Sequence, residues 1–78
     1  MNKFSILFSP NELYDWLDLK LGIGDEYREI FEINHINANT FLTVDLKFFK
    51  DVGILSIGVR VKFLGIIVKR RKRCGIDL

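Results

Sequence analysis

The chain has 78 residues, of which 49% are hydrophobic and 28% are charged, a composition typical of a small folded domain and unlike that of a disordered segment. Its formal net charge of +2 is unevenly divided: residues 56–78 hold seven Lys and Arg against one acidic residue, whereas residues 1–55 hold five against nine. Such a division favours head-to-tail association of proteins over a broad nucleic-acid-binding surface.

Several functional classes lack the residues that they require. The single cysteine, Cys74, cannot form an internal disulfide, so we expect a reducing, cytoplasmic location. The single histidine, His35, has no cysteine near it in the sequence, so we expect no metal site, no cofactor and no enzymatic activity. Arg60, Lys62 and Lys69 interrupt the most apolar stretch, so we expect no integral membrane contact.

The first predicted helix begins after Ser9, which we expect to be its N-cap. Pro10 follows at the first helical position, and Glu12 stands three residues after the serine, which is the spacing of a capping box. The apolar residues that recur at helical spacing and should face inward are Leu13, Trp16, Leu17 and Leu21.

Three shorter helices are predicted next. Gly22 and Gly24 interrupt the pattern, and Asp25 is expected to cap a second helix. The inward residues of that helix are predicted to be Tyr27, Ile30 and Phe31. Residues 34–44 are rich in Asn and Thr, which indicates a turn and one short third helix. Asp45 should cap a fourth short helix, which ends at a glycine.

A long last helix is predicted from about Ile57 to about Arg73, with Ser56 as its N-cap. Its apolar residues cover more than half of the helix circumference, so we expect it to contact several neighbours, with its apolar part in the core. They are Ile57, Val59, Val61, Phe63, Leu64, Ile66, Ile67 and Val68. The basic run 69–73 fits a hydrated helix end, an attraction to anionic lipid or a nuclear localisation signal. The fold class is therefore all-α, a compact bundle of five helices.

The order of these motifs resembles the sterile alpha motif (SAM) domain over about residues 8–70. The segments that carry the resemblance are FSPNELYDWL, YREIF, INANTFL, DVGI and SIGVRVKFL. We accordingly expect an N-terminal extension at residues 1–7, a SAM-like domain at 8–73 and a C-terminal tail at 74–78. Phe8, Ala38 and Val59 depart from the residues common in the family, but none of the three removes a core position.

The resemblance implies protein–protein interaction, because SAM domains most often bind other SAM domains within signalling or scaffold assemblies. They do so through two surfaces, an acidic mid-loop face and a basic end-helix face. The mid-loop face would comprise Glu32, Asn37, Asn39, Asp45, Phe48 and Asp51. The end-helix face would comprise Leu55, Ser56, Ile57, Val59, Arg60 and Lys62.

Two questions stay open at this level. Phe48 stands where the family usually has a polar residue, so it is either an exposed interface anchor or a cover for Ile6, Leu7 and Phe8. The alternative function is RNA binding, since a minority of SAM domains bind RNA hairpins and open their last helix with a segment similar to GILSIGVRVKFL. Acidic residues near the end of the first helix oppose that alternative.

Overall fold

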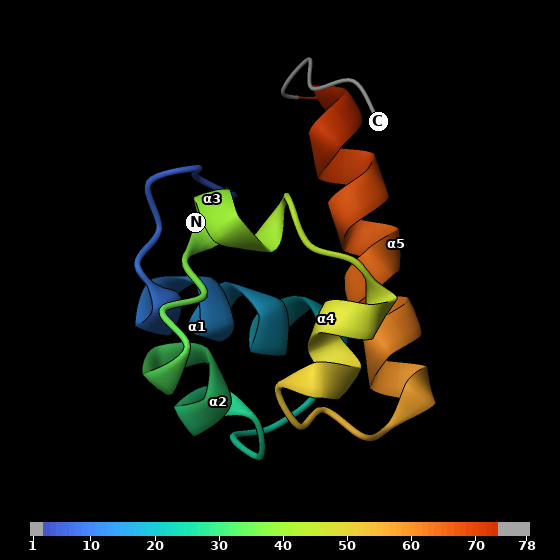
Figure 1. The fold of residues 1–78 in the computed structure, drawn as a ribbon. Helices are drawn as coiled ribbons and strands as arrows, with labels where there is room; N and C mark the ends of the chain where they lie inside the picture. The colour runs from blue at the N-terminus through green and yellow to red at the C-terminus, as the bar shows by residue number, and fades with distance from the viewer. Residues whose placement is uncertain (1–2, 74–78) are drawn as a thin grey trace. The chain divides into compact units, whose positions relative to one another are not determined.

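A computed structural model describes residues 3–73 of the chain, and every regular element in that part is a helix (Figure 1). The helices are α1 (Pro10–Leu21), α2 (Arg28–Ile33), α3 (Ala38–Phe41), α4 (Leu46–Asp51) and α5 (Ile57–Arg73). The predicted all-α class, with five helices and a long last one, is confirmed. Cys74 and the predicted tail lie outside the described residues. The chain divides into two units, residues 1–41 and 42–78.

The start of α1 is the predicted capping box. The Glu12 N–H donates to Ser9 Oγ at 3.2 Å, and the Ser9 N–H donates to Glu12 Oε1 at 2.9 Å. Two backbone donors that the first helical turn leaves without partners are satisfied in this way. The helix ends at Gly22, whose φ of 64° is a left-handed conformation that glycine adopts without steric cost.

The core of the first unit gathers around α1 and its aromatic neighbours. Leu13, Trp16 and Leu17 are buried as predicted, and Tyr14 is fully buried as well. The Tyr14 and Phe31 rings meet edge to face, with centroids 5.1 Å apart. The other buried residues of this unit are Tyr27, Ile36, Ala38 and Phe41.

The segment before α1 is joined to the first unit by aromatic and backbone contacts. The Phe4 ring lies 5.1 Å from the Trp16 ring and 5.8 Å from the Phe8 ring, both edge to face. The carbonyl of Phe8 accepts a hydrogen bond of 3.1 Å from the Ala38 N–H at the start of α3. Phe4, within the predicted extension, therefore contributes to the packing of α1.

The expected N-cap of α2 is wrong. The helix begins at Arg28, and its N-cap residue, Tyr27, makes no side-chain capping bond. Asp25 instead closes a turn, because its carbonyl accepts from the Arg28 N–H at 3.1 Å. Its carboxylate accepts from the Arg28 guanidinium at 2.9 Å. The arginine thus occupies the acceptor that a capping aspartate would offer to the helix.

The second unit pairs α4 with α5. Asp45 caps α4 as predicted, since its Oδ1 accepts from the Phe48 N–H at 3.0 Å. Gly53, with a φ of 110°, follows α4. The Phe49 and Phe63 ring centroids lie 5.2 Å apart, which joins the two helices. The buried residues of this unit are Leu42, Phe49, Ile54, Phe63 and Ile67.

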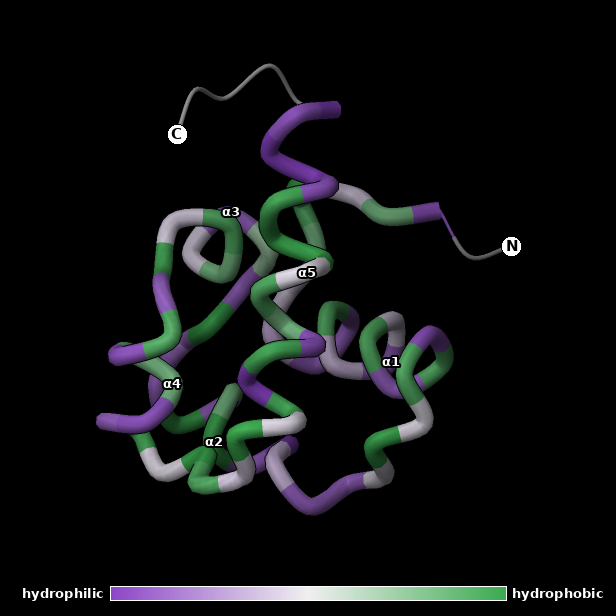
Figure 2. The backbone as a smooth tube through the Cα atoms, turned by 90° about the vertical axis from the view of Figure 1, so that its right-hand side faces the viewer, coloured by the Kyte–Doolittle hydropathy of each residue, from purple (hydrophilic) through white to green (hydrophobic). Residues whose placement is uncertain are grey.

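The predicted burial of the apolar residues of α5 holds for only part of them. Phe63 and Ile67 are buried, whereas Ile57, Val61 and Val68 are 58%, 53% and 39% exposed. Phe63 and Ile67 are one helical turn apart and share one side of the helix. The three exposed residues lie on another side, about 120° away. Figure 2 shows that the apolar stretches of α5 give way to a hydrophilic last segment.

Candidate interaction surfaces

The predicted end-helix residues lie together in the second unit, immediately before and within the first turns of α5. Leu55 is 74% exposed, and Ile57 is also largely exposed. Ser56 is exposed and accepts the Val59 N–H at its Oγ, at 3.3 Å, which confirms it as a cap. Lys62 is exposed, while Val59 and Arg60 are half-buried.

Arg60 is held close to the start of its own helix. Its Nη2 donates to the Leu55 carbonyl at 3.2 Å, and its backbone N–H donates to the Ser56 carbonyl at 3.1 Å. Its Nε is buried and makes no hydrogen bond within the described residues. The guanidinium charge is thereby held at the Leu55 carbonyl, immediately before α5.

The charged residues of this surface, Arg60 and Lys62, are both basic. Helix α5 contains seven Lys and Arg and no acidic residue. The partial positive charge at a helix N-terminus adds to the charges of Arg60 and Lys62. A carboxylate-bearing surface would therefore be attracted to the start of α5, and high salt would weaken that attraction.

The predicted mid-loop residues belong to both units. Glu32, Asn37 and Asn39 lie in residues 1–41, and all three are exposed. Asp45, Phe48 and Asp51 lie in residues 42–78. The structure therefore describes two groups of these residues, each within its own unit.

Three of these polar side chains already have structural partners. Asn37 Oδ1 accepts from the Thr40 N–H at 2.8 Å at the start of α3. Asp45 caps α4, and Asp51 pairs with Lys47 at 3.2 Å on the same helix. For these residues, local stabilisation of a short helix accounts for the side chain without a binding role.

The sequence left open whether Phe48 is an exposed interface anchor or a cover for the N-terminal apolar residues, and its observed burial is intermediate. Its side chain is half-buried, and its ring meets Phe49 edge to face with centroids 5.8 Å apart. Part of the ring is therefore used inside the second unit, and part remains accessible.

The acidic side of the first unit also carries an exposed apolar residue. Ile33, at the end of α2, is 66% exposed, and both Glu29 and Glu32 on the same helix are exposed. Residues 1–41 contain seven acidic residues and three Lys or Arg. This combination of apolar and negative side chains is complementary in charge to the start of α5.

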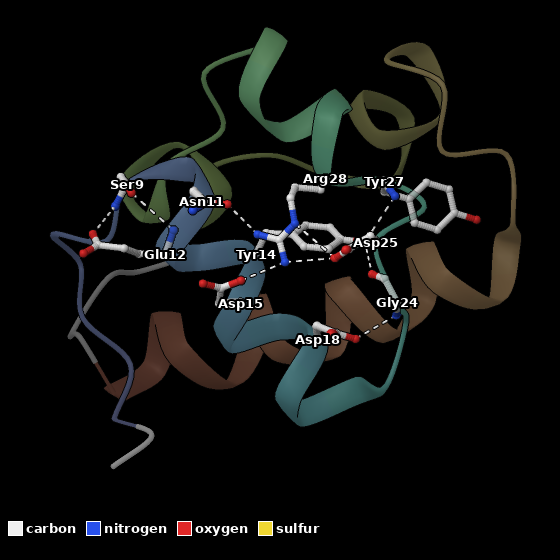
Figure 3. Close-up of polar contacts among 10 residues, drawn as sticks. All are labelled: Ser9, Asn11, Glu12, Tyr14, Asp15, Asp18, Gly24, Asp25, Tyr27 and Arg28. Atoms are coloured by element: carbon white, nitrogen blue, oxygen red, sulfur yellow. Dashed lines mark hydrogen bonds and ion pairs between the residues drawn. The ribbon is translucent and has the colours of Figure 1, made fainter.

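The sequence analysis missed a polar cluster that Figure 3 shows around Tyr14 and Arg28. The Tyr14 hydroxyl donates to the Gly24 carbonyl at 2.7 Å and accepts from the Tyr27 N–H at 3.2 Å. Burial raises the pKa of the Tyr14 phenol. The spacing of Tyr14 three residues before Leu17 was a signal for its burial.

Arg28 completes this cluster from the start of α2. Its guanidinium pairs with Asp15 at 2.7 Å and with Asp25 at 2.9 Å, and it also donates to Asn11. The hydrogen bonds that Arg28 donates to Asp15 and Asp25 raise its pKa, and the bond to Asp15 has the larger effect. The guanidinium carbon lies 4.9 Å from the Tyr14 ring centroid. These contacts join α1 to α2, which gives the cluster a structural role.

Residues 3–73 contain neither a candidate metal site nor a candidate membrane-spanning helix. No group of three or more His, Cys, Asp or Glu is placed to hold a metal ion there. None of the helices in that part has the length and apolar character needed to cross a membrane.

Comparisons with protein-family models, with curated proteins and with solved structures gave no match to the chain.

Proposed function

We propose that the chain is a non-enzymatic protein–protein interaction module, a SAM-like domain that associates with a second copy or with a related domain. The observation that carries the proposal is the exposed pair Leu55 and Ile57 beside Arg60 and Lys62 at the start of α5. Large apolar side chains that are exposed next to oriented charges are typical of binding surfaces.

The acidic surface of the first unit supports head-to-tail association. Ile33 offers an apolar anchor beside the carboxylates of Glu29 and Glu32, and Glu32 belongs to the predicted mid-loop face. An interface of this kind is heterologous: the basic face of one copy binds the acidic face of the next. The apolar residues supply most of the affinity, while the charges orient the partners and raise the association rate.

Sedimentation velocity over a wide concentration range, at low and at high salt, tests this proposal. We expect concentration-dependent growth that salt suppresses. Leu55→Ser should weaken association by about thirtyfold or more, as truncation of a central apolar anchor does. Leu19→Ser is the matched control, because Leu19 is 62% exposed on α1 and outside both predicted faces.

Mixing two defective variants separates head-to-tail association from other arrangements. Leu55→Ser removes the end-helix face, and Glu32→Lys reverses a charge of the mid-loop face. Each variant alone should self-associate much more weakly than the wild type, whereas their mixture should form a one-to-one dimer through the two intact faces. A wild-type chain that stays monomeric at all concentrations would contradict self-association, and equal association by Leu55→Ser would contradict the assigned surface.

Binding of an RNA hairpin is the second candidate, because Leu55 stands exposed next to a helix that contains only basic charges. A titration with hairpin RNA whose affinity falls steeply with salt would favour it. Against it, residues 1–41 are predominantly acidic and would repel phosphate.

A further inference from the structure

One side of α5 carries a row of apolar residues that are exposed and do not belong to the buried core of the second unit. Ile57, Val61 and Val68 are 58%, 53% and 39% exposed, and we call these three residues the α5 stripe. Their positions on the helix fall within about 40° of one another, so they form a line along about three turns. The half-buried Leu64 lies at its edge. The stripe extends well beyond the predicted end-helix face, with which it shares only Ile57.

Cations border the α5 stripe along both edges. Arg60 and Arg71 lie on one side of it and are half-buried, while Lys69 and Lys72 lie on the other side and are exposed. No acidic residue occurs in α5 to neutralise them. An occupant of this face must therefore offer both negative charge and an apolar region.

The arrangement of the basic residues 69–73 around the helix indicates which kind of partner could bind this side of α5. Residues 69–73 are consecutive on a helix, so their side chains point in five directions around its axis. The carboxylates of a single protein partner could pair with only some of them. A continuous negative surface attracts the cations on both edges of the stripe at once, and attracts those on the far side of the helix more weakly, because a helix is about 10–12 Å wide and the Debye length in physiological salt is about 8 Å.

Two other occupants fit less well. A second α5 helix would bring two uniformly basic helices together, which like-charge repulsion opposes. RNA would satisfy the cations, but the stripe is aliphatic and offers no aromatic ring on which a base could stack.

We propose that this side of α5 binds the surface of membranes that contain anionic phospholipids. The helix lies parallel to the membrane, the α5 stripe enters the boundary between headgroups and acyl chains, and the bordering cations contact anionic headgroups. The long side chains of Lys69 and Lys72 reach the headgroup level while their methylene groups stay beside the stripe. This inference does not depend on the proposed self-association.

Vesicle co-sedimentation of the full chain tests it, with circular dichroism to verify folding of each variant. We expect binding to vesicles of phosphatidylcholine mixed with phosphatidylserine, no measurable binding to phosphatidylcholine alone, and a decrease with salt. The double variant Lys69→Glu, Lys72→Glu should bind at least about thirtyfold more weakly, since each lost cation contributes about tenfold or less and each new carboxylate adds repulsion.

Control variants that change the same charge, or remove similar apolar side chains, outside α5 make the test specific to this side of the helix. Lys3→Glu with Lys50→Glu changes the net charge equally at exposed positions outside α5, and should stay within about threefold of the wild type. Val61→Ser with Val68→Ser should weaken binding by about tenfold, because the apolar area that enters the lipid is lost. Leu7→Ser with Leu19→Ser, at exposed apolar positions outside α5 and outside both predicted faces, should leave it unchanged.

Several results would overturn the proposal. These are equal binding to neutral vesicles, equal losses from the two Lys→Glu pairs, and no loss from the Val61 and Val68 substitutions. Tighter binding of a hairpin RNA than of anionic vesicles at the same ionic strength would assign the face to nucleic acid. Absence of vesicle binding, together with self-association that Val68→Ser abolishes, would assign it to a second copy.

Discussion

The buried hydroxyl of Tyr14 gives the sharpest stability prediction. Tyr14→Phe removes one oxygen atom, while the ring keeps its place against Phe31. The hydroxyl makes two hydrogen bonds, to the Gly24 carbonyl at 2.7 Å and from the Tyr27 N–H at 3.2 Å. Each contributes about 1 kcal/mol, and leaving the buried N–H without a partner adds to the loss. We expect the free energy of unfolding to fall by about 2–3 kcal/mol.

Urea unfolding followed by circular dichroism measures this change. Tyr27→Phe is the matched control, because the Tyr27 hydroxyl makes no hydrogen bond within residues 3–73. We expect that control to lie within about 0.5 kcal/mol of the wild type. A Tyr14→Phe variant as stable as the wild type, or equal losses in the two variants, would refute this account of the cluster.

The raised pKa of Tyr14 adds a dependence on pH. Since the phenol ionises more readily in the unfolded chain, its contribution is complete below pH 10.0 and is lost as the pH rises through the higher pKa of the folded state. Wild-type stability should therefore fall more steeply above that pH than the stability of Tyr14→Phe. Parallel pH profiles for the two proteins would contradict the burial of an ionisable hydroxyl.

Two further substitutions test the elements that hold each unit. Ser9→Ala removes the acceptor for the Glu12 N–H and should cost about 1 kcal/mol, seen as a decrease of about 4–8 °C in Tm, while Ser5→Ala should change Tm by less. Phe63→Ala empties a fully buried site against Phe49 and should cost about 3–5 kcal/mol in urea unfolding or prevent folding. Val61→Ala, at an exposed position of the same helix, should cost less than about 1 kcal/mol, and similar losses at 61 and 63 would contradict the described packing of α5.

Helix starts that depend on nearby residues could be predicted from the sequence. Ser9 and Asp45 cap their helices through bonds to residues three positions later, so the pattern and the contact are both local. The start of α2 could not be found in this way. It depends on Arg28, which binds Asp25 from the preceding turn and also Asp15 from α1, and the contact with Asp15, 13 residues earlier, leaves no periodic signal.

The main difference between prediction and structure concerns α5, where fewer of the apolar side chains are buried than predicted. Apolar periodicity identifies residues suited to burial, but the number of neighbouring elements decides how many of them are covered. In the candidate site, Leu55 and Ile57 are exposed, as an end-helix face requires. Mutual binding of the two faces stays a prediction, as does membership of the SAM family.

The edge contacts of Phe4 have a practical consequence for handling the protein. Because the Phe4 ring packs on Trp16, a protease that cleaved the bond between Phe8 and Ser9 would release both the Phe4 ring beside the indole and the carbonyl that accepts from the Ala38 N–H. Trp16 is the only tryptophan of the chain, so its fluorescence would report that cleavage directly. An affinity tag is consequently best attached ahead of this segment, with Phe4 through Phe8 left intact.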